Sequence, residues 1–201
     1  NKVGITNYES FAKEVLAAIP DRPVSFEVFA DDLPSMLAQA KMIASWGPNV
    51  NVKIPITNTK GEFTGPIIKK LAGAGVQLNI TAIMTLEQVK DVAENLSPET
   101  PAIVSVFAGR VADTGLDPMP IMRNCVKFLE DLPKAELLWA SPRELLNIIQ
   151  ADEVGCHIIT ATPDVLGKLK LLEKDLTEFS LETVQMFYDD AEAAGYKINI
   201  A

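Results

Sequence analysis

The sequence predicts an α/β fold whose strands run parallel, and two observations lead to this fold class. Short β-branched or apolar runs recur roughly every 20 to 35 residues and alternate with helical stretches, which is typical of parallel strands joined by crossover helices. Within several runs the apolar residues occupy alternate positions, the period of a strand. No Pro/Ser-rich linker or low-complexity segment interrupts the series, so we expect a single domain over residues 1–201.

Six segments are predicted to be strands, and local signals mark the helix starts between them. The strand segments are 24–30, 51–56, 76–83, 102–108, 136–140 and 157–161. The helix signals are two pairs that match the capping-box pattern, Thr85 with Gln88 and Ser141 with Glu144, and two prolines suited to a first helical turn, Pro142 and Pro163.

Composition narrows the classes of protein that the chain can represent. With 201 residues, 48% of them hydrophobic, it can bury one sizeable core. The net charge of −9 argues against nucleic acid or an anionic membrane as the main partner, because both would repel it. Cys125 and Cys156 are too few for a disulfide framework. The sequence shows neither an apolar run of ~18 residues nor a cleavable signal, so we expect a cytoplasmic protein.

Two architectures suit the alternation, a doubly wound open sheet and a closed (β/α)8 barrel. A nucleotide-binding open sheet should show G-x-G-x-x-G after its first strand, whereas "GAGVQL" at 73–78 departs from that pattern and precedes a strand. In a barrel, the strand face opposite the helices points inward. Polar or ionisable residues recur on that parity in four successive strands and predict a shared interior site. They are Ser25, Glu27, Lys53, Asn79, Thr81 and Ser105, with Phe107 beside them.

Lys53 is the most informative of these residues. It interrupts a run in which Val50, Val52, Ile54 and Ile56 take alternate positions, so its side chain belongs to the opposite face. Taken alone, a strand lysine is most simply read as part of a solvated sheet face. The other strands decide between that interpretation and an interior site.

Four motifs, "VNVKIPIT", "LNITAI", "SVFAGR" and "WASPREL", resemble the transaldolase family, including its short form and the related fructose-6-phosphate aldolases. The resemblance runs from about residue 7 to 195 in the expected order. It implies a class I aldolase-type (β/α)8 TIM barrel that acts on small-molecule sugar phosphates, with no metal and no other cofactor. In such a barrel a strand lysine forms a Schiff base with a ketose phosphate, which makes Lys53 the expected nucleophile.

The resemblance also assigns roles around Lys53. Glu27 would hold, with the hydroxyl of Thr81, a water that transfers protons while the Schiff base forms; the alternative for Glu27 is a salt bridge inside the barrel. Asn79 would bind hydroxyls of the donor and Ser105 would line the same pocket, although both could be barrel-layer fillers. Glu27 and Phe107 match transaldolases proper, since the aldolases carry Gln and Tyr there, so transfer to an aldose phosphate is favoured over simple cleavage. Phe107 is equally compatible with core packing.

Phosphate recognition is predicted at Arg110, Ser141 and Arg143. Arg110 ends a strand, and Ser141 and Arg143 lie where a strand should give way to a helix N-terminus, whose free N–H groups favour an anion. The alternative is a capping box of Ser141 and Glu144 that serves no ligand. Pro142 departs from the family, which usually has Phe or a similar residue there.

Two further segments have plain interpretations. His157 is interpreted as a structural residue, because it has no Cys, Asp or Glu at metal-ligand spacing. Cys156 beside it is interpreted as a small buried residue. The acidic segment 173–196 has apolar residues near helical spacing and is expected to be a terminal helix that covers the barrel or a neighbouring subunit. We therefore expect a homo-oligomer.

The main departure from the family is at the front of the chain. A complete barrel has eight strands, and the family's first two, with their Thr-Asn-Pro motif, an aspartate and an asparagine, have no counterpart. We therefore expect the sequence to represent a longer protein incompletely. Three alternatives remain: a non-catalytic sugar-phosphate-binding protein on the same scaffold, a fructose-6-phosphate aldolase-like enzyme, and an unrelated lysine-dependent barrel aldolase.

Overall fold

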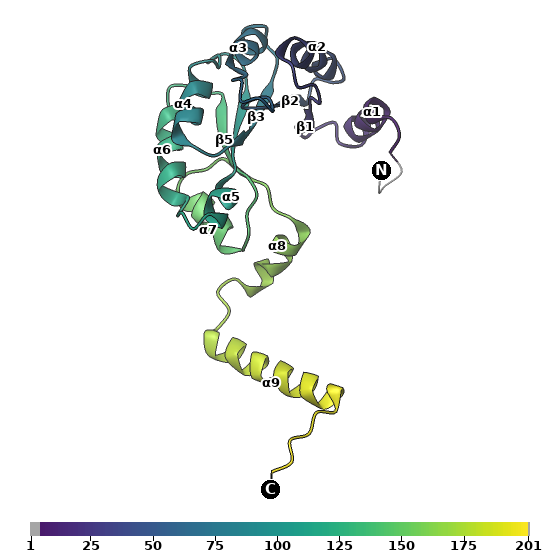
Figure 1. Cartoon of the computed structure of the whole chain (residues 1–201), viewed down its shortest axis with the longest axis vertical. Coiled ribbons are helices and arrows are strands. Elements are labelled where there is room, and N and C mark those ends of the chain that lie inside the picture. The colour runs from purple at the N-terminus through teal and green to yellow at the C-terminus, as the bar shows by residue number, and fades with distance from the viewer. Residues whose placement is uncertain (1–4, 201) are drawn as a thin grey trace. The chain divides into compact units, whose positions relative to one another are not determined.

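The computed structural model describes residues 5–200, which separate into two compact units at the boundary between Thr162 and Pro163. The first unit holds a parallel sheet with its helices (Figure 1). The second holds α8 (Pro163–Gly167), a 3-10 turn (Lys168–Leu171) and α9 (Leu176–Ala194). Across the described residues, no helix combines the length and the apolar character that crossing a membrane requires.

The sheet has six parallel strands in the order β1-β2-β3-β4-β5-β6, as the sequence predicts. Four strands are shorter than expected. Residues 28–30, 76–77, 107–108, 157 and 160–161 lie outside β1, β3, β4 and β6, and Ala108 begins helix α5. Each strand pairs with the next one along the chain, so the connecting helices are crossovers. The strands are β1 (Val24–Glu27), β2 (Val50–Pro55), β3 (Leu78–Ile83), β4 (Ala102–Val106), β5 (Ala135–Trp139) and β6 (Ile158–Ile159).

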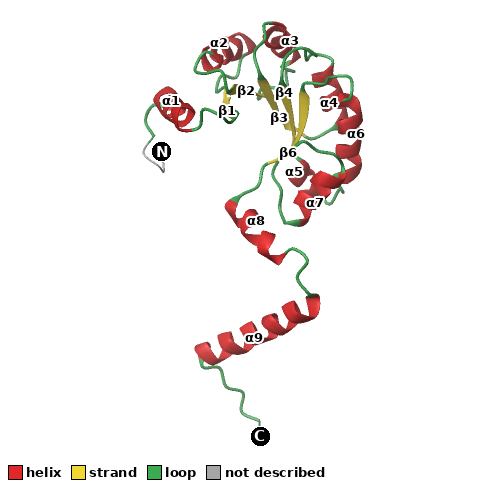
Figure 2. Ribbon diagram, turned by 180° about the vertical axis from the view of Figure 1, so that it is seen from behind, coloured by secondary structure: helices red, strands yellow, loops and turns green. Residues whose placement is uncertain are grey.

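Helices cover one side of the curled sheet (Figure 2). Thr85 caps α4 in the expected capping box with Gln88, and Pro163 is the first residue of α8, so these two of the predicted helix starts are confirmed. The helices of the first unit are α1 (Tyr8–Ala18), α2 (Leu33–Ala44), α3 (Gly65–Gly73), α4 (Leu86–Ala93), α5 (Ala108–Asp113), α6 (Met119–Leu129) and α7 (Leu146–Glu153).

The main core lies between the sheet and these helices. Val52 and Ile54, on either side of Lys53, are fully buried in it, which confirms that this parity of β2 faces the helices. Each such side chain contributes about 1.5–3 kcal/mol by leaving water. A second, small apolar cluster lies around Ile103, Leu138 and Ala140. The sheet therefore packs a continuous apolar layer on one face and a mixed one on the other.

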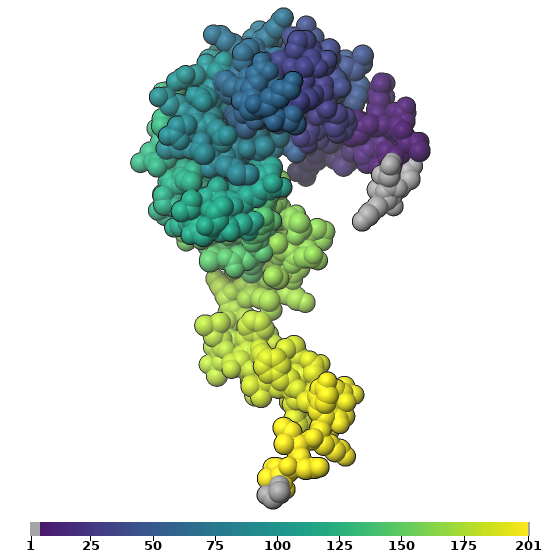
Figure 3. Space-filling model, in the orientation of Figure 1, coloured from purple at the N-terminus to yellow at the C-terminus, as the bar shows by residue number. Residues whose placement is uncertain are grey.

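β1 and β6 form the two edges of the sheet. In the described part of the chain each pairs with one neighbour only, and they do not pair with each other, so the sheet curls without closing at six strands. The space-filling view shows a hollow in the first unit, bordered by residues of α1 in purple (Figure 3). This curled sheet is the scaffold on which the candidate site is built.

Candidate active site

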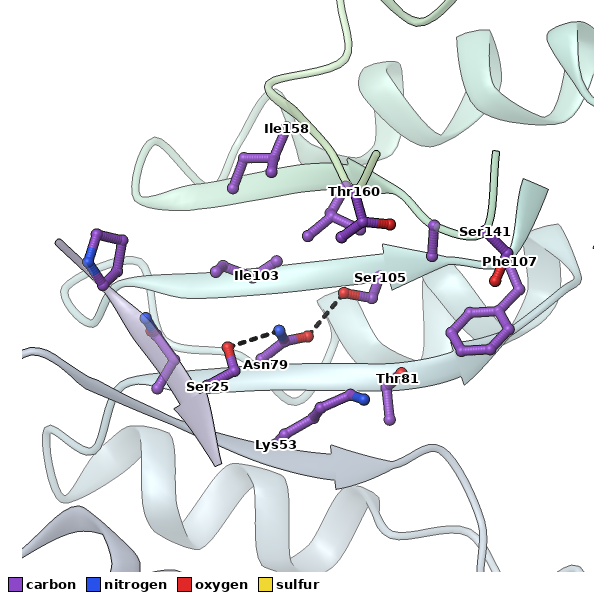
Figure 4. Close-up of a pocket in the computed structure, with 14 residues that line it drawn as sticks. Ser25, Lys53, Asn79, Thr81, Ile103, Ser105, Phe107, Ser141, Ile158 and Thr160 are labelled. Atoms are coloured by element: carbon purple, nitrogen blue, oxygen red, sulfur yellow. Dashed lines mark hydrogen bonds between the residues drawn. The ribbon is translucent and has the colours of Figure 1, made fainter. Parts of the chain in front are cut away.

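A cavity of about 450 Å³ lies against the strand face opposite the main core (Figure 4). The inward parity predicted for Ser25, Lys53, Asn79, Thr81, Ser105 and Phe107 is confirmed, since all six line it. The remaining lining residues are Pro23, Asn51, Ile103, Leu138, Ala140, Ser141, Ile158 and Thr160. Because β1 to β4 all contribute, the cavity is a shared site of neighbouring strands.

Lys53 and Glu27 face each other across the β1–β2 pair. The register sets their Cα atoms opposite one another, and Lys53 Nζ donates to Glu27 Oε2 at 3.1 Å. The side chains keep 31% and 41% of their exposure, so the pair is partly open to solvent. Glu27 is not among the residues that line the cavity. Its contact in the structure is thus the salt bridge that sequence analysis kept as the alternative.

Asn79 is buried and is the centre of a hydrogen-bonded chain that joins β1, β3 and β4. Its Nδ2 donates to Ser25 Oγ at 2.9 Å, and its Oδ1 accepts from Ser105 Oγ at 2.7 Å (Figure 4). These bonds fix which end of the amide faces which strand. A carboxamide has two donor hydrogens and two acceptor lone pairs, so one of each stays free for another partner. Asn79 can therefore be both a packed layer residue and a polar contact.

Thr81 lines the cavity, and its hydroxyl oxygen is buried without a protein partner in the described chain. The residue is 3% exposed, and its Oγ1 has no hydrogen-bond partner among residues 5–200. A buried hydroxyl without a partner costs free energy, so such groups are rare in stable cores. This observation marks Thr81 as a residue whose side chain the packing alone does not explain.

The three residues expected to bind phosphate are in different environments. Ser141 lines the cavity, whereas Arg110, on α5, places its guanidinium carbon 5.2 Å from the ring centroid of Phe107. Arg143 forms a bidentate ion pair with Asp113 at the end of α5. The hydrogen bonds from Arg143 lower the pKa of Asp113 below its ordinary value of 3.8. Ser141 thus faces the cavity, and Arg143 is held beside α5.

The predicted helix N-terminus at Ser141 is wrong. Helix α7 begins at Leu146, and Ser141 has a left-handed backbone with φ of 59°. The N–H groups of Arg143 and Glu144 instead donate to Oδ1 of Asn147, at 2.7 and 3.2 Å. Because the Asn147 side chain satisfies these donors, the chain needs no capping box there, and Pro142 precedes the helix. The free N–H groups expected for an anion are therefore already occupied.

Gly109 lets this loop approach α5. A Cβ atom at this position would lie 1.5 Å from the carbonyl oxygen of Ser141, which is backbone and cannot rotate away. The Gly109 N–H also donates to the carbonyl of Ala140 at 3.2 Å. Close packing therefore explains why the motif "SVFAGR" has a glycine at this position. Gly109 lets helix α5, which carries Arg110, contact the loop that contains Ser141.

Sequence reasoning missed two polar residues of the cavity, Asn51 and Thr160. Asn51 is 4% exposed and lies two residues before Lys53 on the same strand face. The period of two could have identified it, since Asn51 has the parity of Lys53. Thr160 follows β6, whose two-residue length gives little periodic signal.

His157 and Cys156 have structural partners, and Cys125 is a buried free thiol. His157 Nδ1 accepts from the N–H of Leu137 at 3.0 Å, which agrees with a structural histidine. Cys156 Sγ contacts the same residue's carbonyl at 3.2 Å. Burial, with Cys156 nearby, raises the pKa of the Cys125 thiol to about 12. Within residues 5–200, no three His, Cys, Asp or Glu side chains gather as a metal site.

Comparison with known proteins identifies the family. The model for transaldolase/fructose-6-phosphate aldolase matches residues 8–199. A probable transaldolase of Dehalococcoides mccartyi is 35% identical over 178 residues, which cover 88% of this chain and 78% of that protein. Probable transaldolase 2 of Listeria monocytogenes is 34% identical over 163 residues, covering 81% and 71%. The chain belongs to the transaldolase/fructose-6-phosphate aldolase family.

A solved structure shows similarity of fold alone. A mandelate oxidase mutant with the monooxide FMN adduct aligns with a TM-score of 0.55 at 15% sequence identity, covering 77% of this chain. The chain spans about half of that protein, 51% of its length. At this identity the likeness carries no statement about activity.

Proposed function

We propose that the protein is a transaldolase-type transferase that moves a dihydroxyacetone unit from a ketose phosphate to an aldose phosphate through a Schiff base on Lys53. The observation that carries the proposal is the place of Lys53: its amine faces a cavity lined by polar side chains and contacts a carboxylate. Membership of the family and the probable transaldolases among its relatives support the reaction class.

The chemistry requires an amine in such a place. The unprotonated Lys53 Nζ attacks the donor's C2 carbonyl, whose oxygen takes up a proton, and loss of that oxygen as water leaves an iminium. The C3–C4 bond then breaks, with the C4 hydroxyl losing its proton, so that an aldehyde departs and the bonding electrons remain in an enamine. Attack of the enamine on the acceptor aldehyde forms the new C–C bond, and water releases the product and regenerates the amine.

Glu27 and Thr81 support the proton transfers in this scheme. Glu27 is the carboxylate that the described chain places in hydrogen-bond contact with Lys53, and Thr81 offers a hydroxyl without a protein partner on the same cavity wall. A water held between these groups would carry the proton that the carbinolamine oxygen needs. The ion pair thus serves as the resting arrangement of the nucleophile and its acid-base partner.

The remaining residues bind the donor in this proposal. Asn79 and Ser105 offer polar groups to hydroxyls of the donor. Arg110, Ser141 and Arg143 form the phosphate site. Arg110 adds local positive charge to a chain of net charge −9, and the guanidinium of Arg143 is oriented by its ion pair with Asp113. Glu27 with Phe107 favours transfer over simple cleavage. Acceptor dependence separates the two activities: an aldolase releases glyceraldehyde 3-phosphate from fructose 6-phosphate without any acceptor.

We also propose that the curled sheet is part of a (β/α)8 barrel and that the protein is a homo-oligomer. The edges of β1 and β6, which pair with no further strand among residues 5–200, support the first point. A crystal structure of the natural gene product tests it, and a sheet that remains at six strands contradicts it.

The apolar side chains of α9 support the proposal of a homo-oligomer, since none of its residues is buried. Sedimentation equilibrium tests that point, and a monomer would contradict it.

Borohydride trapping tests the reaction. Fructose 6-phosphate and sodium borohydride should add the reduced donor fragment to Lys53 alone, as peptide mass mapping would show. A Lys53→Met variant should take up no label, whereas the matched variant Lys41→Met, in the last turn of α2, should label like the wild type. Label on another lysine overturns the role of Lys53. No label in the wild type, together with measurable binding of fructose 6-phosphate, favours a non-catalytic sugar-phosphate-binding protein.

A further inference from the structure

Strand β3 carries one residue more than its neighbour at the level of the cavity. Its pairing with β4 matches Ile80 with Val104 and then Ile83 with Val106, so three steps on β3 oppose two on β4. Such an extra residue is a β-bulge, a feature found next to active sites because it re-aims side chains. The bulge of β3 lies at Thr81 and Ala82.

Ala82 has a backbone that alanine rarely adopts. Its φ is 62°, in the left-handed region where the Cβ atom crowds the following carbonyl group. Three residues other than glycine have positive φ in the described chain, and Ala82 is the one that lies in a strand. Strain of this kind persists where the surroundings determine the conformation.

The bulge changes which face of β3 each side chain joins. Leu78 and Ile80 are fully buried in the main core, and Thr81 lines the cavity. Strict alternation would then send Ile83 to the cavity, yet Ile83 is fully buried in the main core. The extra residue therefore keeps an isoleucine out of the site while Thr81 stays in it.

Both flanks of the bulge are tied to strands of the site. The carbonyl of Thr81 accepts from the N–H of Ile56, just after the strand of Lys53, at 2.9 Å. The carbonyl of Ile83 accepts from the N–H of Phe107 at 2.7 Å. Ala82 thus lies between two fixed points, and its conformation sets how far Thr81 is turned. Figure 4 shows Thr81 and Lys53 on neighbouring strands of the same cavity.

We propose that Ala82 is a positioning residue: its left-handed bulge aims the Thr81 hydroxyl at the Lys53 amine for Schiff-base formation. The proposal rests on the proposed function, because the reaction gives the unpartnered hydroxyl its role. The proton that the carbinolamine oxygen takes up must arrive within hydrogen-bond reach. Ala82 itself touches neither the donor nor the reacting atoms, and it acts through Thr81.

Two variants change the bulge in different ways. Deletion of Ala82 gives a regular ladder in which Ile83 still faces the core, so the fold can persist. The Thr81 hydroxyl, however, would no longer have the orientation that the bulge gives it. Ala82→Val puts a β-branched side chain at positive φ, which drives the strand toward a regular conformation and turns Ile83 toward the cavity. The matched control is Glu173→Val, because Glu173 has φ of 57° but lies after the 3-10 turn of the second unit.

The measurements are single-turnover borohydride trapping with fructose 6-phosphate, the kcat and KM of transfer, and thermal melting. Deletion of Ala82 and Ala82→Val should both slow Schiff-base formation and kcat by ~10-fold or more. The deletion should leave KM for the phosphorylated donor within about twofold, whereas Ala82→Val should also raise KM because it turns Ile83 toward the cavity. Glu173→Val should lose melting temperature comparably to Ala82→Val and keep kcat. This split separates a positioning role from a general loss of structure.

The outcomes distinguish this inference from the proposed function. The role of Ala82 is overturned if the Schiff base is trapped in the wild type and equally fast in folded bulge variants. The proposed reaction would still hold in that case. Kinetic losses that merely follow the folded fraction also overturn it. If the deletion variant does not fold, Ala82→Val decides alone. A wild type that is never trapped overturns the reaction and the positioning role together.

Discussion

The amine of Lys53 and the carboxylate of Glu27 lie 3.1 Å apart on two paired strands, with Cα atoms in direct register. An amine that attacks a carbonyl must be unprotonated, and a carboxylate at hydrogen-bond distance is the group to which its proton can pass. The same carboxylate can return a proton, through water, to the carbinolamine oxygen. The pair therefore links the nucleophile to the proton transfers of the proposed reaction.

Glu27→Gln should reduce turnover with little effect on stability. Glutamine keeps a hydrogen-bonding group beside Lys53 but cannot carry the proton, so we expect kcat to fall by roughly 10²-fold or more. The pair is partly exposed, and such pairs contribute only ~0–1 kcal/mol, so the melting temperature should change little. The control is Glu9→Gln, which removes an exposed pair with Lys13 on α1. Unchanged kcat in Glu27→Gln would show that Glu27 is only a salt-bridge partner.

Arg143→Ala should selectively weaken the binding of phosphorylated donors. Loss of a charge-assisted phosphate contact costs about 1.5–3 kcal/mol, or roughly ten- to a hundredfold in affinity. Free dihydroxyacetone has no phosphate, so its apparent binding constant should stay nearly constant. Arg123→Ala, at an exposed position of α6, is the matched loss of charge. Equal effects of Arg143→Ala on both donors would make the residue a structural partner of Asp113.

The sequence predicted the inward face of the sheet well because a strand has a fixed period. Once Val52 and Ile54 were assigned to the helix side, Lys53 had to face the other way, and the same argument holds for Asn79 and Ser105. This argument needs only local alternation and a rule for parallel sheets. Four of the six predicted strands contain enough residues to show this alternation.

Two features near the site come from backbone states that the sequence pattern does not encode. Ser141 and Glu144 match a capping box, yet a left-handed φ at Ser141 and the Asn147 carboxamide delay helix α7. The bulge at Ala82 reverses the alternation after Thr81. Alanine and serine give no signal for positive φ as glycine does, so both states depend on tertiary contacts.

Gly109→Ala should destabilise the first unit, whereas Gly73→Ala should not. The added Cβ at residue 109 would lie 1.5 Å from the Ser141 carbonyl oxygen, so the loop or α5 must move. We expect a loss of more than ~2 kcal/mol in the free energy of unfolding. At Gly73, in α3, nothing lies within 4 Å, and alanine should stabilise the helix by about 0.5–1 kcal/mol. Urea unfolding of both variants checks this, and equal stabilities would contradict the close contact.

Cys125 should make stability depend on alkaline pH. Burial raises the pKa of its thiol from 9.0 to about 12 in the native state. Below pH 9 the thiol is protonated in both states and contributes no pH dependence. Between pH 9 and 12 the unfolded chain loses this proton and the native one keeps it, so the free energy of unfolding falls as pH rises.

The comparison with Cys125→Ala isolates this effect, because all other titrating groups are shared. The stability difference between the wild type and the variant should be constant below pH 9 and should shrink above it, as measured by urea unfolding from pH 7 to 10.5. A difference that grows with pH would mean that the thiol ionises more readily in the native state than in the unfolded chain.

Thr81→Val should make the protein more stable and less active. The Thr81 hydroxyl is buried without a protein partner, so replacing it by a methyl group removes a desolvated polar atom and should raise the free energy of unfolding by on the order of 1 kcal/mol. Thr100→Val is the matched control, since its equally buried hydroxyl donates to the Ala72 carbonyl at 2.8 Å and its loss should cost about 1 kcal/mol. For Thr81→Val we expect kcat to fall by ~10-fold or more, because the reaction loses its proton carrier. Stability is measured by urea unfolding and transfer by a coupled assay. If Thr81→Val loses stability as Thr100→Val does and keeps its kcat, the hydroxyl has a structural partner and no part in the reaction.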